Sequence, residues 1–239
     1  MRINECHFLI IDTETTGLNP DADEVVEIAA VRYGPQQGIL GVWSALVNPG
    51  RPIPPEASAV HGITDAMVER APDKLAVVSE LARILRSDDV LVAHNAAFDR
   101  AFLPSDMHGP WLCTYRLARH LWPQAPKHAN QYLRYWLGLD VANMGIHRAT
   151  ADALVTTALL DRILRDHAKT HMEDDLDDAM ERLIAYADSP IQVLTMPFGK
   201  HAGTPLAEVP RDYLAWALRN MADMDPDLRA SIEASVVSA

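Results

Sequence analysis

The chain has 239 residues, 49% of them hydrophobic, which is enough for one full domain with a sizeable core and a smaller appendage. Its 33 acidic and 21 basic residues give a net charge of −12, which argues against a protein that holds nucleic acid on a broad electropositive surface. Nucleic acid stays open as a substrate, because acids that recruit divalent cations, together with a local basic rim, accept a polyanion.

The sequence carries no targeting or disulfide signal. No run approaches the length of a membrane span, and the initial MRINECHF lacks the features of a signal peptide, so we expect a cytoplasmic protein with no membrane contact. Cys6 and Cys113 have no metal-type spacing and are expected to be reduced and structural.

Three strand patterns open the chain. They are FLIID, EVVEIAAVRYG and ILGVWSALVNP, and a turn-rich TTGLNPDAD separates the first two, which predicts a three-stranded antiparallel start. A proline-rich stretch, GRPIPPEASAVHGI, comes next. We then expect a short helix around TDAMVER and a longer one over KLAVVSELARILRS, with Asp73 as its N-cap.

Helices dominate the next part of the chain. One short strand is predicted over DDVLVAH, and beyond Asn95 we expect helices over AAFDRAFL, CTYRLARHLW, NQYLRYWLG and TADALVTTALLDRILRDHAK. Strands first, then a strand embedded among helices, indicate an α/β or α+β fold with a mixed sheet covered by helices.

A second, smaller unit is predicted over residues 171–239. Its pattern gives a helix over DLDDAMERLIAYA, a hairpin-like IQVLTMPFGKHAGTPL, and helices over RDYLAWALRNM and DPDLRASIEASV, which resembles a small α+β module. Lys200, His201 and Gly203 fall at the turn. Together with Arg211, the two basic residues form either a rim that binds nucleic acid or part of a structural cap, and the sequence leaves both open.

Two carboxylates stand at the end of the first strand. In FLIIDTETTG, Asp12 and Glu14 are separated by one Thr, so they point to the same side of an extended chain. Like charges that close raise each other's pKa unless a cation lies between them. For this stretch alone, an ordinary solvated strand end is an equal alternative.

Two further acids and a histidine are spaced along the helical part. Asp99 lies in a helix that begins near Asn95, directly after a strand. His147 and Asp152 are five residues apart, so on one continuous helix they would point about 140° apart. If the helix begins after His147, Asp152 faces the site and His147 lies over it from the loop. Taken singly, each of these side chains is more often satisfied or solvated.

The three segments together resemble a known family. FLIIDTETTG, VAHNAAFD and HRATAD, in this order, resemble the three motifs of the DEDD 3′→5′ exonucleases, in the His-bearing (DEDDh) branch. That branch includes the proofreading subunit of bacterial DNA polymerase and ribonuclease T. The resemblance spans about residues 7–168 and implies a ribonuclease-H-like α/β domain, which we place at residues 1–170. The C-terminal MPFGKHAGTPLAEVPRDYLAWALRN also resembles the tail of one member of this branch, an exodeoxyribonuclease.

The resemblance implies a metal-dependent phosphodiesterase. The family's four acidic ligands match Asp12, Glu14, Asp99 and Asp152, and its catalytic histidine matches His147. Four carboxylates suit two Mg²⁺ ions about 4 Å apart, with Mn²⁺ as a substitute. His147 would be the general base that takes the proton from the attacking water. The implied reaction releases nucleoside 5′-monophosphates from DNA 3′ ends, single-stranded or duplex, in repair or proofreading.

Six residues are implied to bind the terminal nucleotide: Thr15, Gly17, Leu18, His61, Asn95 and Phe98. The backbone around Thr15 would contact the 3′-hydroxyl, and Leu18 would lie beside the terminal base. Phe98 would stack under a base, a contact that tolerates any sequence. For Phe98 alone, a place in the core is the stronger interpretation.

Two other functions stay open at the level of sequence. No residue reveals a contact that tests for the 2′-hydroxyl, so an RNA 3′-trimming exonuclease of the same superfamily is the nearest rival. A non-catalytic module whose acids hold a structural cation is the second, and five intact catalytic positions argue against it. Strand preference, processivity, oligomeric state and pathway do not follow from the sequence.

Overall fold

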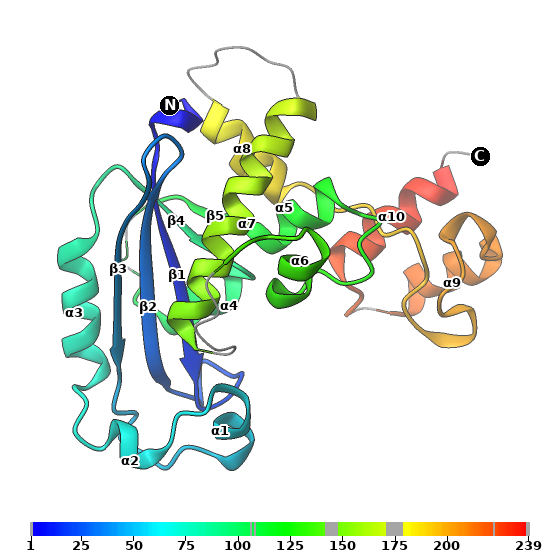
Figure 1. Ribbon diagram of the computed structural model, residues 1–239. Helices are drawn as coiled ribbons and strands as arrows, with labels where there is room; N and C mark the ends of the chain where they lie inside the picture. The colour runs from blue at the N-terminus through cyan, green and yellow to red at the C-terminus, as the bar shows by residue number, and fades with distance from the viewer. Residues whose placement is uncertain are drawn as a thin grey trace.

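The computed structural model describes residues 2–105, 107, 109–141, 148–170, 179–221 and 223–237. In this part of the chain, a five-stranded sheet is covered by helices, and a smaller helical unit lies to one side of it (Figure 1). The α/β fold with a mixed sheet, expected from the sequence, is confirmed.

The sheet has the strand order β3-β2-β1-β4-β5, which puts β1 at its centre. Its strands are β1 (His7–Thr15), β2 (Val25–Gly34), β3 (Gly38–Leu46), β4 (Asp89–Ala93) and β5 (Trp111–Cys113). The first three strands pair antiparallel, as predicted, and β1, β4 and β5 pair parallel. The three-residue β5 was not predicted, because WLC is too short to show a strand pattern within a helical region.

Ten helices occur in the described residues. They are α1 (Pro55–His61), α2 (Asp65–Val68), α3 (Lys74–Ile84), α4 (Ala96–Phe102), α5 (Thr114–Leu121), α6 (Asn130–Trp136), α7 (Ala149–Thr170), α8 (Ala179–Asp188), α9 (Arg211–Asn220) and α10 (Pro226–Val237). The predicted N-cap of α3 is confirmed, since Asp73 Oδ1 accepts a hydrogen bond from Ala76 N at 2.8 Å. α1 was not predicted, although Pro55 suits a first helical position. None of these helices is both long and apolar enough to cross a membrane.

The two faces of β1 explain its unbroken apolar run. Phe8 and Ile10 belong to a core with α5, α7 and α8, whereas Leu9 and Ile11 belong to a second core with α3 and α4. All four side chains are at most 1% exposed. A strand buried on both faces reads as a continuous hydrophobic sequence. Because side chains alternate, the residues that follow at even positions point to the α7 face.

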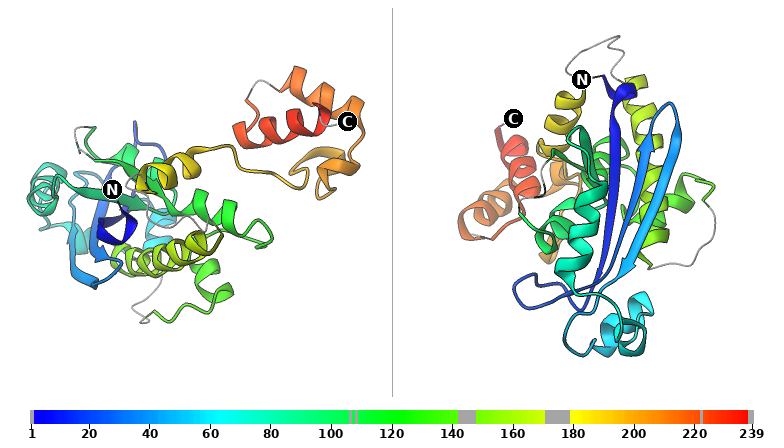
Figure 2. Two further views of the ribbon diagram at one scale, coloured as in Figure 1. Left: turned by 90° about the horizontal axis from the view of Figure 1, so that it is seen from above. Right: turned by 90° about the vertical axis from the view of Figure 1, so that its left-hand side faces the viewer.

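The C-terminal unit has a core of its own. Met196, Leu206, Leu214 and Leu228 are among the buried side chains that gather from α9, α10 and the segment before them. The predicted helices are confirmed as α9 and α10. Within the described residues, the hairpin-like stretch forms one isolated bridge, Thr195 with Pro205, instead of two strands. Figure 2 shows α9 and α10 set apart from the sheet and reached by an extended segment.

The division into residues 1–170 and 171–239 stays a prediction. The packing of α8 argues for a later boundary, because its residues Met180, Leu183 and Ala187 lie in the same core cluster as Leu160 and Ile163 of α7. We therefore propose that the boundary between the two units falls after α8, near Ser189, and that α8 completes the larger unit.

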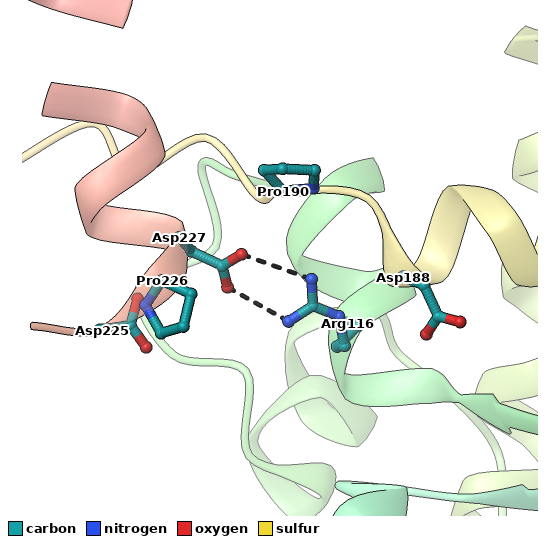
Figure 3. Close-up of a pocket in the computed structure, with 6 residues that line it drawn as sticks. All are labelled: Arg116, Asp188, Pro190, Asp225, Pro226 and Asp227. Atoms are coloured by element: carbon teal, nitrogen blue, oxygen red, sulfur yellow. Dashed lines mark hydrogen bonds and ion pairs between the residues drawn. The ribbon is translucent and has the colours of Figure 1, made fainter. Parts of the chain in front are cut away.

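An ionic junction holds the smaller unit against α5. Arg116 donates to the carbonyls of Ala187 at 2.7 Å and Ser189 at 2.8 Å, and its guanidinium reaches both oxygens of Asp227 at 3.3 Å (Figure 3). Asp227, the second residue of α10, is 5% exposed and also accepts from Ile191 N at 2.9 Å. The junction thus fixes both the linker and the start of α10 to the larger unit.

Truncation tests the proposed boundary. A chain ending at Ser189 should stay soluble and unfold cooperatively, whereas one ending at Thr170 should lose several kcal/mol of stability, because it removes α8 and uncovers the apolar side chains of α7. Urea unfolding followed by circular dichroism measures both. Equal stability of the two chains would place the boundary back at residue 170.

Candidate active site

The end of β1 projects beyond its parallel neighbour. β4 pairs with β1 only from His7 to Ile10, whereas β2 follows β1 as far as Thr15. Asp12 and Glu14 lie in this extension, are half-buried, and point to the α7 face. The β4 side of the strand end is therefore open to side chains from other elements.

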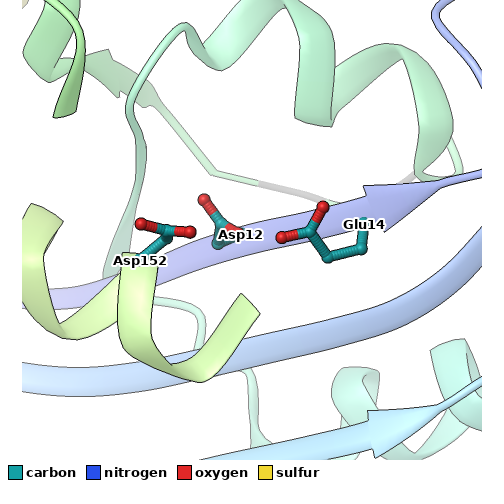
Figure 4. A group of neighbouring side chains, drawn as sticks. All are labelled: Asp12, Glu14 and Asp152. Carbon is teal, nitrogen blue, oxygen red and sulfur yellow. The ribbon is translucent and has the colours of Figure 1, made fainter. Parts of the chain in front are cut away.

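α7 brings a third acid to the two on β1. Asp152 lies in the first turn of the helix and is 7% exposed. One carboxylate oxygen from each of Asp12, Glu14 and Asp152 lies within 4.8 Å of the others, and Figure 4 shows the three groups turned toward one another. The start of α7 at Ala149 confirms that the helix begins after His147. His147 itself lies outside the described residues.

The fourth acid, Asp99, is bound to the backbone between the first two. β4 turns into α4 through Asn95, whose φ of 75° makes it the one described non-glycine residue in the left-handed region. Asp99 in the first turn of α4 is 4% exposed. Its Oδ1 accepts from Thr13 N at 3.0 Å and from Thr13 Oγ1 at 2.8 Å. The strand end that β4 leaves unpaired is thus satisfied by this carboxylate.

Burial, and for two of them the nearby like charges, raises the proton affinity of Asp12, Glu14 and Asp99. Burial, followed by the charges of Asp99 and Asp152, raises the pKa of Asp12 well above its usual range. Burial and then the charge of Asp152 raise the pKa of Glu14 to about 8. Burial raises the pKa of Asp99 to about 7, although the hydrogen bonds from Thr13 act in the opposite direction. Without a cation, the group is therefore strained by like charge.

The donor set fits divalent metal ions. Hard carboxylate oxygens are the ligands that Mg²⁺ and Mn²⁺ bind through, and here they converge from β1 and α7. Among the described residues, no Lys or Arg forms an ion pair with Asp12, Glu14 or Asp152, so their charge is not balanced by a side chain in contact. A bound dication would relieve the like-charge repulsion that, together with burial, raises the pKa values of Asp12 and Glu14.

Glu27 and Arg148 border the acid group and were not predicted from the sequence. Glu27 lies opposite Glu14 on β2 and is 3% exposed. Its oxygens accept from Arg148 Nε at 3.0 Å and Nη2 at 2.6 Å, and from Ala149 N at 3.0 Å. The carboxylate thereby caps α7 and ties the residue after His147 to the sheet. The sequence signal that could have identified Glu27 is a charged residue inside the otherwise apolar strand pattern EVVEIAAV.

α6 holds Asp152 from the other side. Gln131 Nε2 donates to Asp152 Oδ1 at 2.6 Å. Asn130 Nδ2 donates to the carbonyl of Asp152 and to Thr156 Oγ1, each at 3.0 Å. These amides orient the carboxylate and the first turn of α7 together. They too were missed, because NQYLRYWLG reads only as the start of a helix.

The loop after β1 carries three of the residues expected to bind the terminal nucleotide. Thr15 is buried and its Oγ1 donates to Gly17 O at 2.6 Å. A side chain at Gly17 would meet Asp23, since a Cβ there would lie 2.4 Å from Asp23 Oδ2. Leu18 is 83% exposed, so its side chain is accessible to a ligand.

The other three expected residues differ in their surroundings. His61 is 3% exposed; its Nδ1 accepts from Ile63 N at 3.0 Å, and burial lowers its pKa. Asn95 is exposed at the turn before α4. Phe98 is half-buried, packs against the α3 side of the sheet, and lies 5.0 Å from the ring of Phe102. Its binding role and that of the other five stay predictions.

The sequence of residues 9–160 matches the family model described as Exonuclease. The chain belongs to this exonuclease family. Residues 189–221 of the exonuclease match a second model, described as Putative quorum-sensing-regulated virulence factor. The family expected from the three motifs is confirmed.

Two relatives of this exonuclease match most of its length. Exodeoxyribonuclease 10 of Escherichia coli (strain K12) is 37% identical over 230 residues, covering 94% of this chain and 96% of that protein. DNA polymerase III subunit epsilon of Treponema pallidum (strain Nichols) is 35% identical over 173 residues, covering 68% of this chain and 78% of that protein. The first match includes the tail, in agreement with the resemblance noted there.

Solved structures share the fold of the exonuclease. Exonuclease X in complex with 5′ overhanging duplex DNA is similar with a TM-score of 0.62 and 38% identity, covering 75% of this chain and 99% of that chain. The nuclease domain of 3′hExo, described as a DEDDh family member bound to rAMP, has a TM-score of 0.58 at 18% identity and covers 67% of this chain and 92% of that chain. The ribonuclease-H-like fold is therefore confirmed.

Substitution of Arg148 tests its contact with Glu27. Arg148→Met should lower the free energy of unfolding by about 1–3 kcal/mol, because it leaves the buried carboxylate of Glu27 without its charged donor. The double variant Glu27→Gln/Arg148→Met should recover part of the loss. Urea unfolding measures both. Arg165→Ala, which breaks the exposed pair with Asp161, is the control and should cost at most about 1 kcal/mol.

The acid group predicts how stability depends on pH without metal. Raised pKa values mean that the folded state binds more protons than the unfolded state, so the free energy of unfolding should fall by about 1 kcal/mol between pH 6.5 and 8.5 in EDTA. Buried His94, whose pKa is lowered to about 4, acts in the opposite direction until its imidazole in the unfolded state has also lost its proton, at about pH 7.5, so the fall should be clearest above that pH. Excess Mg²⁺ should restore the loss at pH 8.5.

Matched variants isolate the acid group. Asp12→Asn should flatten the pH dependence, because it removes one charge from the group, whereas Glu80→Gln on the exposed face of α3 should leave it unchanged. Thermal melts across the pH series measure all three proteins. An Asp12→Asn slope equal to that of the wild type would contradict the like-charge explanation.

Proposed function

We propose that the chain hydrolyses DNA from its 3′ end and releases nucleoside 5′-monophosphates. The observation that carries this proposal is the convergence of Asp12, Glu14 and Asp152 within 4.8 Å, with Asp99 bound to the strand between the first two. Membership of the exonuclease family and the 37% identity to Exodeoxyribonuclease 10 support DNA as the substrate.

We assign the four acids as ligands of two Mg²⁺ ions, for which Mn²⁺ can substitute. Such ions, when bound, supply Lewis-acid activation of water and stabilise charge on the departing 3′-oxygen. Gln131 and the Glu27–Arg148 pair keep Asp152 and the start of α7 in place. Thr13 fixes Asp99 in the same way, through its backbone N–H and its hydroxyl. Asp99 and Asp152 are therefore oriented by hydrogen bonds from neighbouring residues.

We assign His147 as the general base. It directly precedes Arg148, which is bound to Glu27, so the chain enters α7 from a fixed point beside the acids. An imidazole accepts a proton near neutral pH and requires no activation by a second group. Neither a Ser nor a Cys nucleophile takes part in this mechanism.

Selection of the strand end is assigned to side chains around the acids. Leu18 is exposed where it can lie beside the terminal base, and His61 is buried with no hydrogen-bond partner for its Nε2 among the described residues. Thr15, Gly17, Asn95 and Phe98 complete the set. None of these contacts depends on base identity, so cleavage should not depend on DNA sequence.

The RNA-trimming alternative is tested by the same assay as DNA cleavage. Single-stranded and duplex DNA and a matching RNA strand, each labelled at the 5′ end, are incubated with the full chain, with Mg²⁺ and with EDTA. We expect a ladder of shortened DNA products with Mg²⁺ and none with EDTA. Faster shortening of RNA than of DNA would favour the RNA-trimming function, and intact strands in every arm would reject both. The cytoplasmic location stays a prediction.

Two variants separate metal binding from proton transfer. Asp152→Ala should abolish cleavage and Mg²⁺-dependent thermal stabilisation together. His147→Ala should lower kcat by about 10²–10⁴-fold and leave the stabilisation by Mg²⁺ near that of the wild type. A His147→Ala protein that loses metal binding as well would make His147 a ligand and reject its assignment as the base.

A further inference from the structure

The C-terminal unit exposes aromatic and basic side chains side by side. Trp216 on α9 is 47% exposed, and its ring centroid lies 5.6 Å from that of Tyr213, one turn earlier. Lys200 Nζ lies 5.1 Å from the centroid of Tyr213, and the ring of His201 lies 4.7 Å from it. We call Lys200, His201, Tyr213 and Trp216 the aromatic–basic patch.

The backbone holds this patch in place. Gly199 has a φ of +70°, and a Cβ there would lie 2.5 Å from the hydroxyl of Tyr213, so the turn accepts Tyr213 only because the residue is glycine. On the inner side of α9, Leu214 and Ala217 are buried in the core of the unit. The core thus fixes α9, and the turn fixes Lys200 over the ring of Tyr213.

The patch has a local charge opposite to that of the whole chain. Lys200 is exposed, and Arg211 is exposed in the first turn of α9. The neighbouring acid on this helix, Asp212, accepts a hydrogen bond from Tyr213 N at 2.9 Å, which turns one of its oxygens to the backbone. Arg211 lies five residues before Trp216 and so points to another side of α9, but in a chain with a net charge of −12 the exposed ammonium of Lys200, over the ring beside an exposed indole, is a site that attracts an anion.

We propose that the aromatic–basic patch binds single-stranded DNA, as a second contact for the strand whose 3′ end enters the active site. An ammonium group pairs with a phosphate, and an exposed aromatic face stacks on a base of any sequence. The inference rests on the proposed function for the identity of the strand. It assigns the smaller unit a role in holding DNA that is independent of the metal ligands.

Binding of oligothymidylate in EDTA tests the patch on the full chain without cleavage. We use a strand of about 20 nucleotides, longer than the roughly 4–16 that one binding fold covers, and measure fluorescence anisotropy over a salt series. Trp216→Ala should weaken binding about tenfold, and Trp216→Phe should keep most of it, because a ring remains. Lys200→Ala should reduce the slope of log K against log salt by about 0.7, the value for one phosphate contact on a single strand. Lys200→Arg should keep the slope.

Two control variants lie on the larger unit. Leu75→Ala removes a side chain that is 77% exposed on α3, and Lys169→Ala removes an exposed lysine near the end of α7. Both should bind like the wild type. Unchanged affinity of Trp216→Ala and an unchanged slope for Lys200→Ala would overturn the proposal and leave the patch as a surface for another kind of partner. If Trp216→Ala lowers the melting temperature, the Lys200→Ala slope decides.

The test also separates this inference from the proposed function. Hydrolysis of a strand of about four nucleotides, too short to reach a second site, should have the same kcat in Trp216→Ala as in the wild type. A wild-type protein that cleaves no strand would reject the proposed function. A wild-type protein that cleaves DNA, with variants that bind the long strand equally well, would reject only the patch.

Discussion

Repulsion among carboxylates at the end of β1 is the constraint on which the rest of the larger unit depends. One oxygen each of Asp12, Glu14 and Asp152 lies within 4.8 Å of the others, and burial together with like charge disfavours the ionised forms of Asp12 and Glu14. Neither the strand nor the helix would bring them together by local preference. The free energy comes from packing, because β1 is buried on both faces and α7 lies across one of them. The apolar core therefore stabilises an arrangement that the acids alone oppose.

The side chains around the acids limit this strain without neutralising it. Thr13 donates twice to Asp99, Gln131 donates to Asp152, and Glu27 has its own cation in Arg148. Each contact fixes the direction of a carboxylate or of the helix that carries it. In the described residues none forms an ion pair with Asp12 or Glu14, and the charge of Arg148 only partly offsets the effects that raise the pKa of Glu14, so the remaining charge is available to metal ions. The neighbouring side chains thus orient the carboxylates, whereas a bound metal ion would balance their charge.

The three motifs that resemble the exonuclease family determined which site residues were predicted, and the periodicity of strand and helix indicated how some of them share a face. Asp12 and Glu14 share a face because side chains alternate on a strand, and the 3.6-residue period showed that His147 and Asp152 could converge only if the helix began between them. Glu27 and Gln131 act through tertiary contacts that span more than 20 residues, and no local pattern reveals such contacts. β5 is three residues long, and the place of α8 in the larger core depends on which face of α7 it covers. These features required the structure.

The net negative charge of the chain explains why a DNA contact on the smaller unit would be useful. A net charge of −12 repels DNA at long range, and the acids that we assign as metal ligands add to this repulsion near the active site. A bound dication reverses the sign locally, but only within about 10 Å at ordinary salt, because ions in solution screen beyond that distance. The strand away from its 3′ end then has no attraction to the larger unit from net charge. Under the binding role proposed for the aromatic–basic patch, a small surface on a separate unit, fixed to α5 through Arg116 and Asp227, would supply that attraction without placing a lysine among the carboxylates. Such a division would keep the carboxylates free for metal while the strand is held at a second, separate point.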